Sequence, residues 1–137
     1  TEESPGDLKD VFARNYRKLN KNNPDVLRII EALKKNYCLG VVTDVMPMHY
    51  RERERLGTYK YFNHIVTSLE AKQAKVEGKQ KIWRMILKKM NAHPEECAVI
   101  DDIKSKLIVP KKLGMKTIHF RNAGQLRRDL KRLGVRV

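Results

Sequence analysis

The sequence predicts an α/β protein with a parallel sheet and flanking helices. Two observations carry this prediction: short apolar segments of strand length recur along the chain, and amphipathic helical patterns separate them. Strands that alternate with helices in this way are typical of a parallel, doubly wound sheet. With 137 residues, of which 41% are hydrophobic, the chain is long enough for one domain with a substantial core. The four predicted strands are Leu39–Thr43, His64–Thr67, Ala98–Ile100 and Thr117–Phe120.

The first 22 residues are expected to form a polar lead-in and a helix, ahead of a core over residues 23–137. Residues 1–7 are polar and acidic and contain Pro5 and Gly6, which favour a flexible segment. The apolar residues that follow recur with a helical period and therefore predict a helix. These residues are Leu8, Val11, Phe12, Tyr16 and Leu19.

Four amphipathic helices are expected in the core, besides a short charged helix that Gly57 would end. Pro24 opens the first, because proline is favoured at the first helical position. The third lies around Ser105–Leu113 and contains Pro110, which should kink or delay it. The apolar faces of the first, second and last helices consist of Val26, Ile29, Ile30 and Leu33; of Ile82, Trp83, Ile86, Leu87 and Met90; and of Leu126, Leu130 and Leu133.

Two adjacent acids, Asp101 and Asp102, directly follow the predicted strand Ala98–Ile100. Open α/β sheets bind their ligands at the carboxyl ends of the strands. Two carboxylates at such an end suit Mg²⁺, which prefers oxygen ligands and neutralises phosphate. Taken alone, the dipeptide favours a helix cap with an acidic first turn, and the metal site depends on the neighbouring sequence.

The chain is strongly basic, with 30 Lys and Arg against 16 Asp and Glu and a net charge of +14. Such a charge favours a polyanionic partner, nucleic acid before an anionic membrane, although a lysine-rich, highly soluble surface is the alternative. The cations fall in several helices and loops, which suits a structured RNA bound through its shape and phosphates. The candidate RNA-binding residues are Arg51, Arg53, Arg55, Lys79, Lys81, Lys88, Lys89, Lys111, Lys112, Arg127, Arg128, Lys131, Arg132 and Arg136.

Cys38 and Cys97 each precede an apolar strand and are interpreted as buried free thiols. Free thiols favour a reducing compartment, so we expect a cytoplasmic protein. Nothing in the sequence resembles a signal peptide or a membrane span, and the four histidines lack the spacing of zinc ligands.

The order of these features resembles the haloacid dehalogenase-like (HAD) superfamily of phosphohydrolases. The strand Leu39–Thr43 with Asp44 resembles the second motif of that family, and Ile65–Glu70 resembles the strand that follows with its S-x-E turn. Val99–Asp102 resembles the acidic fourth motif, and Leu113–Phe120 resembles the last strand. The resemblance covers most of the chain from Pro24 onward.

The resemblance implies a HAD-like Rossmannoid sheet with a phosphate site at its carboxyl edge. In this family the second-motif hydroxyl and the third-motif lysine hold the phosphoryl oxygens, and the fourth-motif acids hold Mg²⁺. Thr43 and Asp44 would then belong to the phosphate site with Lys75 or Lys79, and Asp101 and Asp102 would be the metal ligands. The helix predicted in the first 22 residues would be a remnant of a helical cap.

The sequence also departs from the family pattern. No strand upstream of Thr43 ends in the D-x-D segment that carries the nucleophile, and the acids of Asp7–Asp10 are separated by two residues. Val76 follows Lys75, where the family usually has proline. We therefore expect the first strand of the sheet to be missing or supplied from elsewhere, and the phosphate site to be vestigial.

These observations lead to a principal hypothesis and two alternatives. The principal one is a non-catalytic, HAD-like RNA-binding protein, ribosomal or ribosome-associated, that contacts rRNA and neighbouring proteins but no membrane. It requires no cofactor, and Mg²⁺ would bind only if the phosphate site is retained. One alternative is the larger part of an Mg²⁺-dependent HAD phosphatase whose nucleophile strand lies outside this chain. The other is a scaffold for protein interactions.

Overall fold

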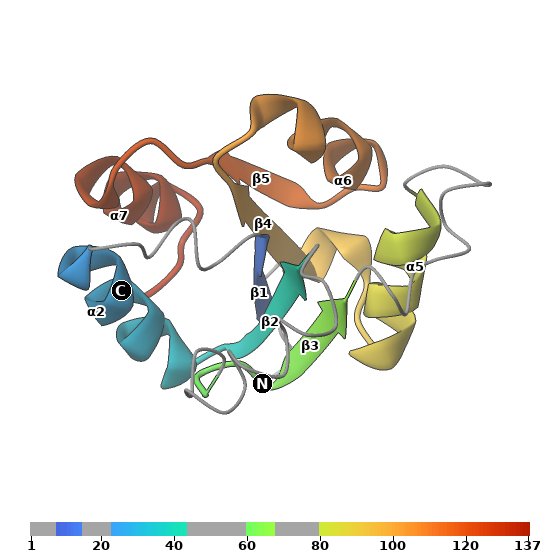
Figure 1. Ribbon diagram of the computed structural model, residues 1–137, viewed down its shortest axis with the longest axis horizontal. Helices are drawn as coiled ribbons and strands as arrows, with labels where there is room; N and C mark the ends of the chain where they lie inside the picture. Colours follow the sequence, from blue (N-terminus) through green and yellow to red (C-terminus); the bar gives the residue numbers. More distant parts are fainter. Residues whose placement is uncertain (1–7, 15–22, 44–59, 68–79) are drawn as a thin grey trace.

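Five strands form one parallel sheet in the computed structural model, which describes residues 8–14, 23–43, 60–67 and 80–137. Their order across the sheet is β3-β2-β1-β4-β5, and all four neighbouring pairs are parallel (Figure 1). The predicted parallel α/β sheet with flanking helices is therefore confirmed. The strands are β1 Asp10–Arg14, β2 Cys38–Thr43, β3 His64–Thr67, β4 Cys97–Asp101 and β5 Lys116–His119.

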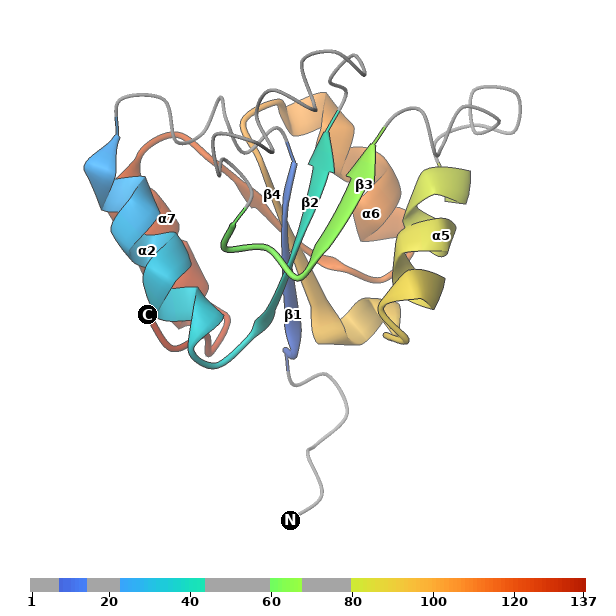
Figure 2. The same ribbon diagram turned by 60° about the horizontal axis from the view of Figure 1, so that its bottom comes forward.

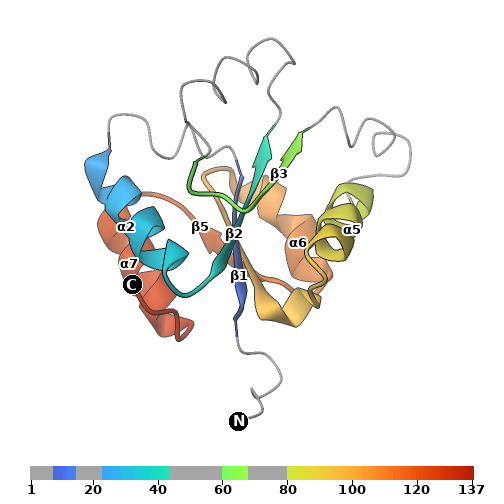
Figure 3. The ribbon, with the colours of Figure 1, turned by 90° about the horizontal axis from the view of Figure 1, so that it is seen from below.

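Helices cover both faces of the sheet (Figures 2 and 3). On one face, α2 (Pro24–Lys34) and α7 (Ala123–Arg132) bury leucine and isoleucine side chains against β1, β2 and β4. On the other, α5 (Gln80–Lys89) and α6 (Ile108–Lys112) lie side by side. The core beneath α5 centres on Trp83. Two 3₁₀ turns flank β4, η1 at Pro94–Glu96 and η2 at Lys104–Leu107.

The helix ends follow from the local sequence. Pro24 begins α2 as predicted, and the Asn23 side chain accepts the backbone N–H of Val26. Pro110 lies in the first turn of α6, where its missing N–H costs no hydrogen bond. The α-helix begins later than the expected segment around Ser105–Leu113, as the proline predicted: the 3₁₀ turn η2 comes first, and the α-helix that follows has only five residues.

Residues 10–14 form a strand, where the helical period of the sequence predicted a helix. Parallel pairing with β2 on one side and β4 on the other satisfies this backbone, and Val11 and Ala13 are 1% and 2% exposed in the core. Tertiary pairing thus overrides the local pattern. The chain itself supplies a strand at the central position that we expected to be empty or filled from elsewhere. Residues 15–22 lie outside the described part, and the proposed boundary at residue 22 stays a prediction.

One residue at the amino end of β1 lowers the stability of the folded state. Asp10 is only 6% exposed and pairs in register with Cys38 on β2 and Cys97 on β4. The Cys97 thiol lies 4.0 Å from Asp10 Oδ2. Burial raises the pKa of Asp10 above its ordinary value of 3.8, the Cys38 thiol offsets part of this by hydrogen bonding, and Glu96 adds to it. Burying the charged form of this carboxylate therefore opposes folding at neutral pH.

Replacing Asp10 by Asn should stabilise the protein at neutral pH. Between pH 3.8 and the raised pKa, the folded state binds more protons at this group than the unfolded chain does. The free energy of unfolding should therefore fall as the pH rises through that window. Asp10→Asn should remove this pH dependence and raise the free energy of unfolding by about 1 kcal/mol at pH 7. Urea unfolding between pH 3 and pH 7 measures this. The control is Asp25→Asn, an exposed acid of α2. Equal profiles for both variants would contradict the burial of β1.

Candidate functional site

The carboxyl ends of all five strands meet at one edge of the sheet (Figure 2), which we call the carboxyl edge. Thr43 ends β2 and pairs with Thr67, the last residue of β3. Asp101 ends β4 and pairs with His119, the last residue of β5. Asp101 and Asp102, which we call the acid pair, therefore lie at the edge where parallel sheets bind ligands.

Asp101 and Asp102 end a strand and do not cap a helix. The turn η2 begins only at Lys104, and the residue that precedes it is Ile103. The Asp101 side chain is fully buried, and its Oδ1 accepts the backbone N–H of Ile103 at 2.9 Å. The Asp101 carbonyl accepts the N–H of Phe120 at 2.8 Å. The acid pair is thus held by the end of the β4–β5 ladder.

His119 adds a contact that the sequence did not reveal. Its Nε2 lies 3.0 Å from the carbonyl oxygen of Asp102. A carbonyl only accepts hydrogen bonds, so Nε2 carries the proton and donates. Residue type and spacing alone gave no sign of this contact, because it depends on the register that sets β5 beside β4.

The acid pair supplies oxygen ligands of the kind that Mg²⁺ takes. Within the described ranges, no group of three or more His, Cys, Asp or Glu side chains could hold a metal ion. Mg²⁺ commonly binds through one or two carboxylates and completes its shell with water and substrate phosphate. Asp101 and Asp102 fit that pattern.

The remaining predicted residues of the phosphate site are Thr43, Asp44, Lys75 and Lys79. Thr43 is the last residue of β2, and the orientation of its side chain is not described. Asp44, Lys75 and Lys79 lie outside the described residues. β1 ends in Ala13 and Arg14, and because Ala13 pairs with Ile100, the backbone of Arg14 comes beside Asp101. The strand end next to the acid pair therefore carries no carboxylate.

The predicted RNA-binding cations do not form one surface among the residues described. Lys88 and Lys89 lie on α5, on one face of the sheet, whereas α7 with its four cations lies on the other (Figure 3). Lys89 Nζ donates to the Ile65 carbonyl at 3.4 Å, and Arg132 is 3.5 Å from Asp129. Lys111 and Lys112 are exposed on α6, and Arg136 is exposed after α7. Arg51, Arg53, Arg55 and the Lys81 side chain are not described.

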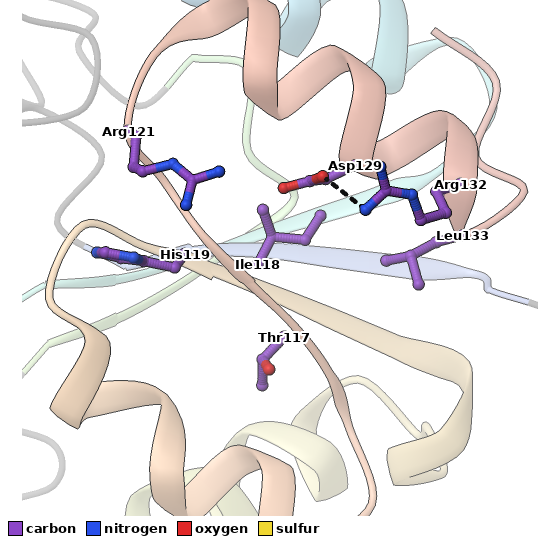
Figure 4. A pocket seen from close by; sticks show the side chains of 7 residues that line it. All are labelled: Thr117, Ile118, His119, Arg121, Asp129, Arg132 and Leu133. Atoms are coloured by element: carbon purple, nitrogen blue, oxygen red, sulfur yellow. Dashed lines mark hydrogen bonds and ion pairs between the residues drawn. The ribbon is translucent and has the colours of Figure 1, made fainter.

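A pocket of about 230 Å³ lies between β5 and α7 (Figure 4). Thr117, Ile118 and His119 line it from β5, and Asp129 and Arg132 line it from α7. Neither acid of the pair belongs to its lining. His119 connects the two places, since it lines the pocket and contacts the Asp102 carbonyl.

Gln125 joins the end of β5 to α7. Its side chain is 3% exposed, and its Oε1 accepts the N–H of Arg121 at 2.8 Å. Its Nε2 donates to the His119 carbonyl at 2.9 Å and to Asp129 Oδ2. Gln125 also completes the capping box of α7 with Asn122. The position of His119 therefore depends on a buried amide whose polar groups are bonded.

A family model of haloacid dehalogenase-like hydrolases matches residues 6–105. This chain belongs to the HAD-like hydrolase family. The phosphorylated carbohydrates phosphatase of Thermotoga maritima is 31% identical over 108 residues, 77% of this chain and 49% of the relative. The glyceraldehyde 3-phosphate phosphatase of Pyrococcus furiosus is 30% identical over 108 residues, 74% of this chain and 42% of the relative. The HAD-like chain thus spans about half the length of these curated relatives.

Solved structures with the same fold include members of the HAD family. A HAD family enzyme of Bacteroides thetaiotaomicron, solved as its magnesium complex, matches with a TM-score of 0.67 and 15% identity over 91% of this chain and 98% of that chain. An uncharacterised protein of Corynebacterium glutamicum matches with a TM-score of 0.70 and 11% identity over 95% and 98% of the two chains. At these identities the matches establish the HAD fold only.

The relatives correct the principal functional hypothesis. Proteins that match about three quarters of this HAD-like chain are phosphatases, so the expectations of a non-catalytic RNA-binding protein and of ribosomal or rRNA partners are wrong. The expectation that the chain is no part of an enzyme is overturned by the same relatives. The high net charge wrongly indicated an RNA-binding surface, because a total charge does not reveal where the cations lie. In the described part of this chain the cationic helices lie on both faces of the sheet.

None of the helices in the described part is long and apolar enough to cross a membrane. The two cysteines are free thiols as predicted; Cys97 is buried as expected, whereas Cys38 is only half-buried. The cytoplasmic location stays a prediction.

Substituting Gln125 by Leu should loosen the joint between β5 and α7. The change removes the hydrogen-bond partner of the Arg121 N–H and of the His119 carbonyl. We therefore expect a loss of about 2 kcal/mol in the free energy of unfolding. Urea unfolding checks this. Lys131→Leu, an exposed change on the same helix, should cost less than about 0.5 kcal/mol. Similar effects of both variants would contradict the role given to Gln125.

Proposed function

We propose that this chain forms the metal- and phosphate-binding part of an Mg²⁺-dependent HAD phosphatase that hydrolyses phosphomonoesters. The observation that carries the proposal is the acid pair, with Asp101 buried and fixed at the carboxyl end of β4 in a parallel sheet. The phosphatase relatives support the reaction class. The magnesium complex of a structural neighbour supports the choice of metal for the family fold.

Asp101 and Asp102 would hold the metal. When bound, Mg²⁺ would neutralise charge on the phosphoryl group as that group is transferred. The chain's own part is to hold both carboxylates at a fixed strand end, so that no side chain has to reorganise during the reaction. A net charge of +14 would also favour the approach of an anionic substrate to the protein as a whole.

Thr43 and one of Lys75 or Lys79 would complete the phosphate site. Thr43 ends the strand beside β1, on the same edge as the acids, where a hydroxyl can donate to a phosphoryl oxygen. A lysine ammonium would add positive charge at the same oxygens. Both assignments follow the family motifs, and Asp44 would stand next to them.

The nucleophilic carboxylate would come from a segment outside this chain, because β1 already fills the central position of the sheet. The residue that β1 places beside Asp101 is Arg14, which cannot act as the nucleophile. Attack by a carboxylate on phosphorus would form an acyl-phosphate as the P–O ester bond breaks and the substrate alcohol leaves with a proton, and water would then hydrolyse the acyl-phosphate to inorganic phosphate and the free carboxylate.

The names of the relatives support a substrate class. One is a phosphatase of phosphorylated carbohydrates and the other of glyceraldehyde 3-phosphate, and we propose phosphorylated carbohydrates as the substrates of this protein.

The test is phosphatase activity of the intact gene product on sugar phosphates and on p-nitrophenyl phosphate. We expect turnover that depends on Mg²⁺ and that falls at least about 100-fold in Asp101→Asn, because that change removes one metal-binding charge. Asp25→Asn, on the outer side of α2, should leave turnover unchanged. Absence of Mg²⁺-dependent turnover, or full activity of Asp101→Asn, would refute the proposal.

A further inference from the structure

The peptide group that joins Asp102 to Ile103 is held at both of its ends. Its oxygen, the Asp102 carbonyl, accepts from His119 Nε2 at 3.0 Å. Its N–H, that of Ile103, donates to Asp101 Oδ1 at 2.9 Å. Because a peptide group is planar, these two hydrogen bonds fix the orientation of one rigid unit. We call this unit the clamped peptide.

The clamped peptide directly follows the two proposed metal ligands along the chain. It is the first peptide unit beyond the β4–β5 ladder, which ends where the Phe120 N–H bonds the Asp101 carbonyl at 2.8 Å. No backbone group of β5 continues the ladder, because the strand ends at His119. The His119 side chain therefore extends the pairing of β4 and β5 by one peptide.

Rotation of the clamped peptide would disturb Asp101. If its carbonyl turned away from β5, its N–H would leave Asp101 Oδ1, and the buried carboxylate would lose a donor that orients it. A hydrogen bond from His119 is thus transmitted to the Asp101 carboxylate through one planar group.

We propose that His119 is a positioning residue for the metal site: it fixes the clamped peptide and thereby orients the carboxylate of Asp101, one of the two proposed Mg²⁺ ligands. The inference rests on the proposed function for its metal. In this role His119 would act through the clamped peptide and not as a metal ligand. Partners of metal ligands typically change metal affinity by 10- to 100-fold when they are removed.

Three variants separate this role from simple packing. His119→Phe keeps a ring of similar size but removes the donor, whereas His119→Gln keeps an N–H donor in a side chain that can extend to the same carbonyl. Thr117→Val is the matched control, since Thr117 lies two residues earlier on the same strand and lines the same pocket. Thr117 pairs with Val99, far from the clamped peptide in the ladder.

The first measurement is hydrogen exchange of the Ile103 amide by NMR, on the full chain without metal. We expect exchange to be at least about tenfold faster in His119→Phe than in the wild type, and close to wild type in His119→Gln and Thr117→Val. Unchanged exchange in His119→Phe would overturn the inference whether or not the protein is a phosphatase.

The second measurement is titration with Mg²⁺ alone, followed by the rise in the unfolding temperature. We expect about tenfold weaker Mg²⁺ affinity in His119→Phe, with recovery in His119→Gln and no change in Thr117→Val. Faster Ile103 exchange with unaltered Mg²⁺ affinity would overturn the positioning role. A wild-type chain that binds no Mg²⁺ would refute the proposed metal site and this role with it, while the exchange data would still show whether His119 holds the peptide.

Discussion

The pairing of β1 with both of its neighbours holds the molecule together. β2 and β4 are buried on both faces, and their backbone groups on the inner side must find hydrogen-bond partners. Five residues, Asp10–Arg14, provide them. Both layers of helices pack on strands whose spacing is set by β1. The same strand spacing positions the edge that carries the acids. Whichever strand occupies this central position therefore decides both the stability of the sheet and the chemistry beside Asp101.

The pattern of the sequence was sufficient for most of the fold. β2 to β5 are apolar segments bounded by turns, and α2, α5 and α7 have one apolar face each, so local periodicity identifies them. β1 could not be found in this way, because its five residues also fit a helical period and Asp10 interrupts its apolar character. Only partners distant in the chain, Cys38 and Cys97, reveal that this segment is a strand.

The candidate site was predictable to the same degree. Two acids after an apolar strand can be recognised from sequence, since the carboxyl ends of parallel strands share one edge. The contact between His119 and the Asp102 carbonyl depends on the register of β5 against β4, which a sequence does not contain. Composition was the weakest guide. The net charge of +14 suggested an RNA-binding protein, but α5 and α7 with their cations lie on opposite faces of the sheet. The relatives are phosphatases.

A metal–phosphate site at the carboxyl edge is the central claim, and a ³¹P NMR titration of inorganic phosphate with this chain tests it most directly, since no nucleophile is needed. Broadening of the phosphate resonance should require Mg²⁺ and should be lost in Asp102→Asn. Exposed lysines alone would broaden the signal without Mg²⁺ and equally in the variant. Broadening that is independent of both Mg²⁺ and Asp102 would contradict a metal–phosphate site at this edge.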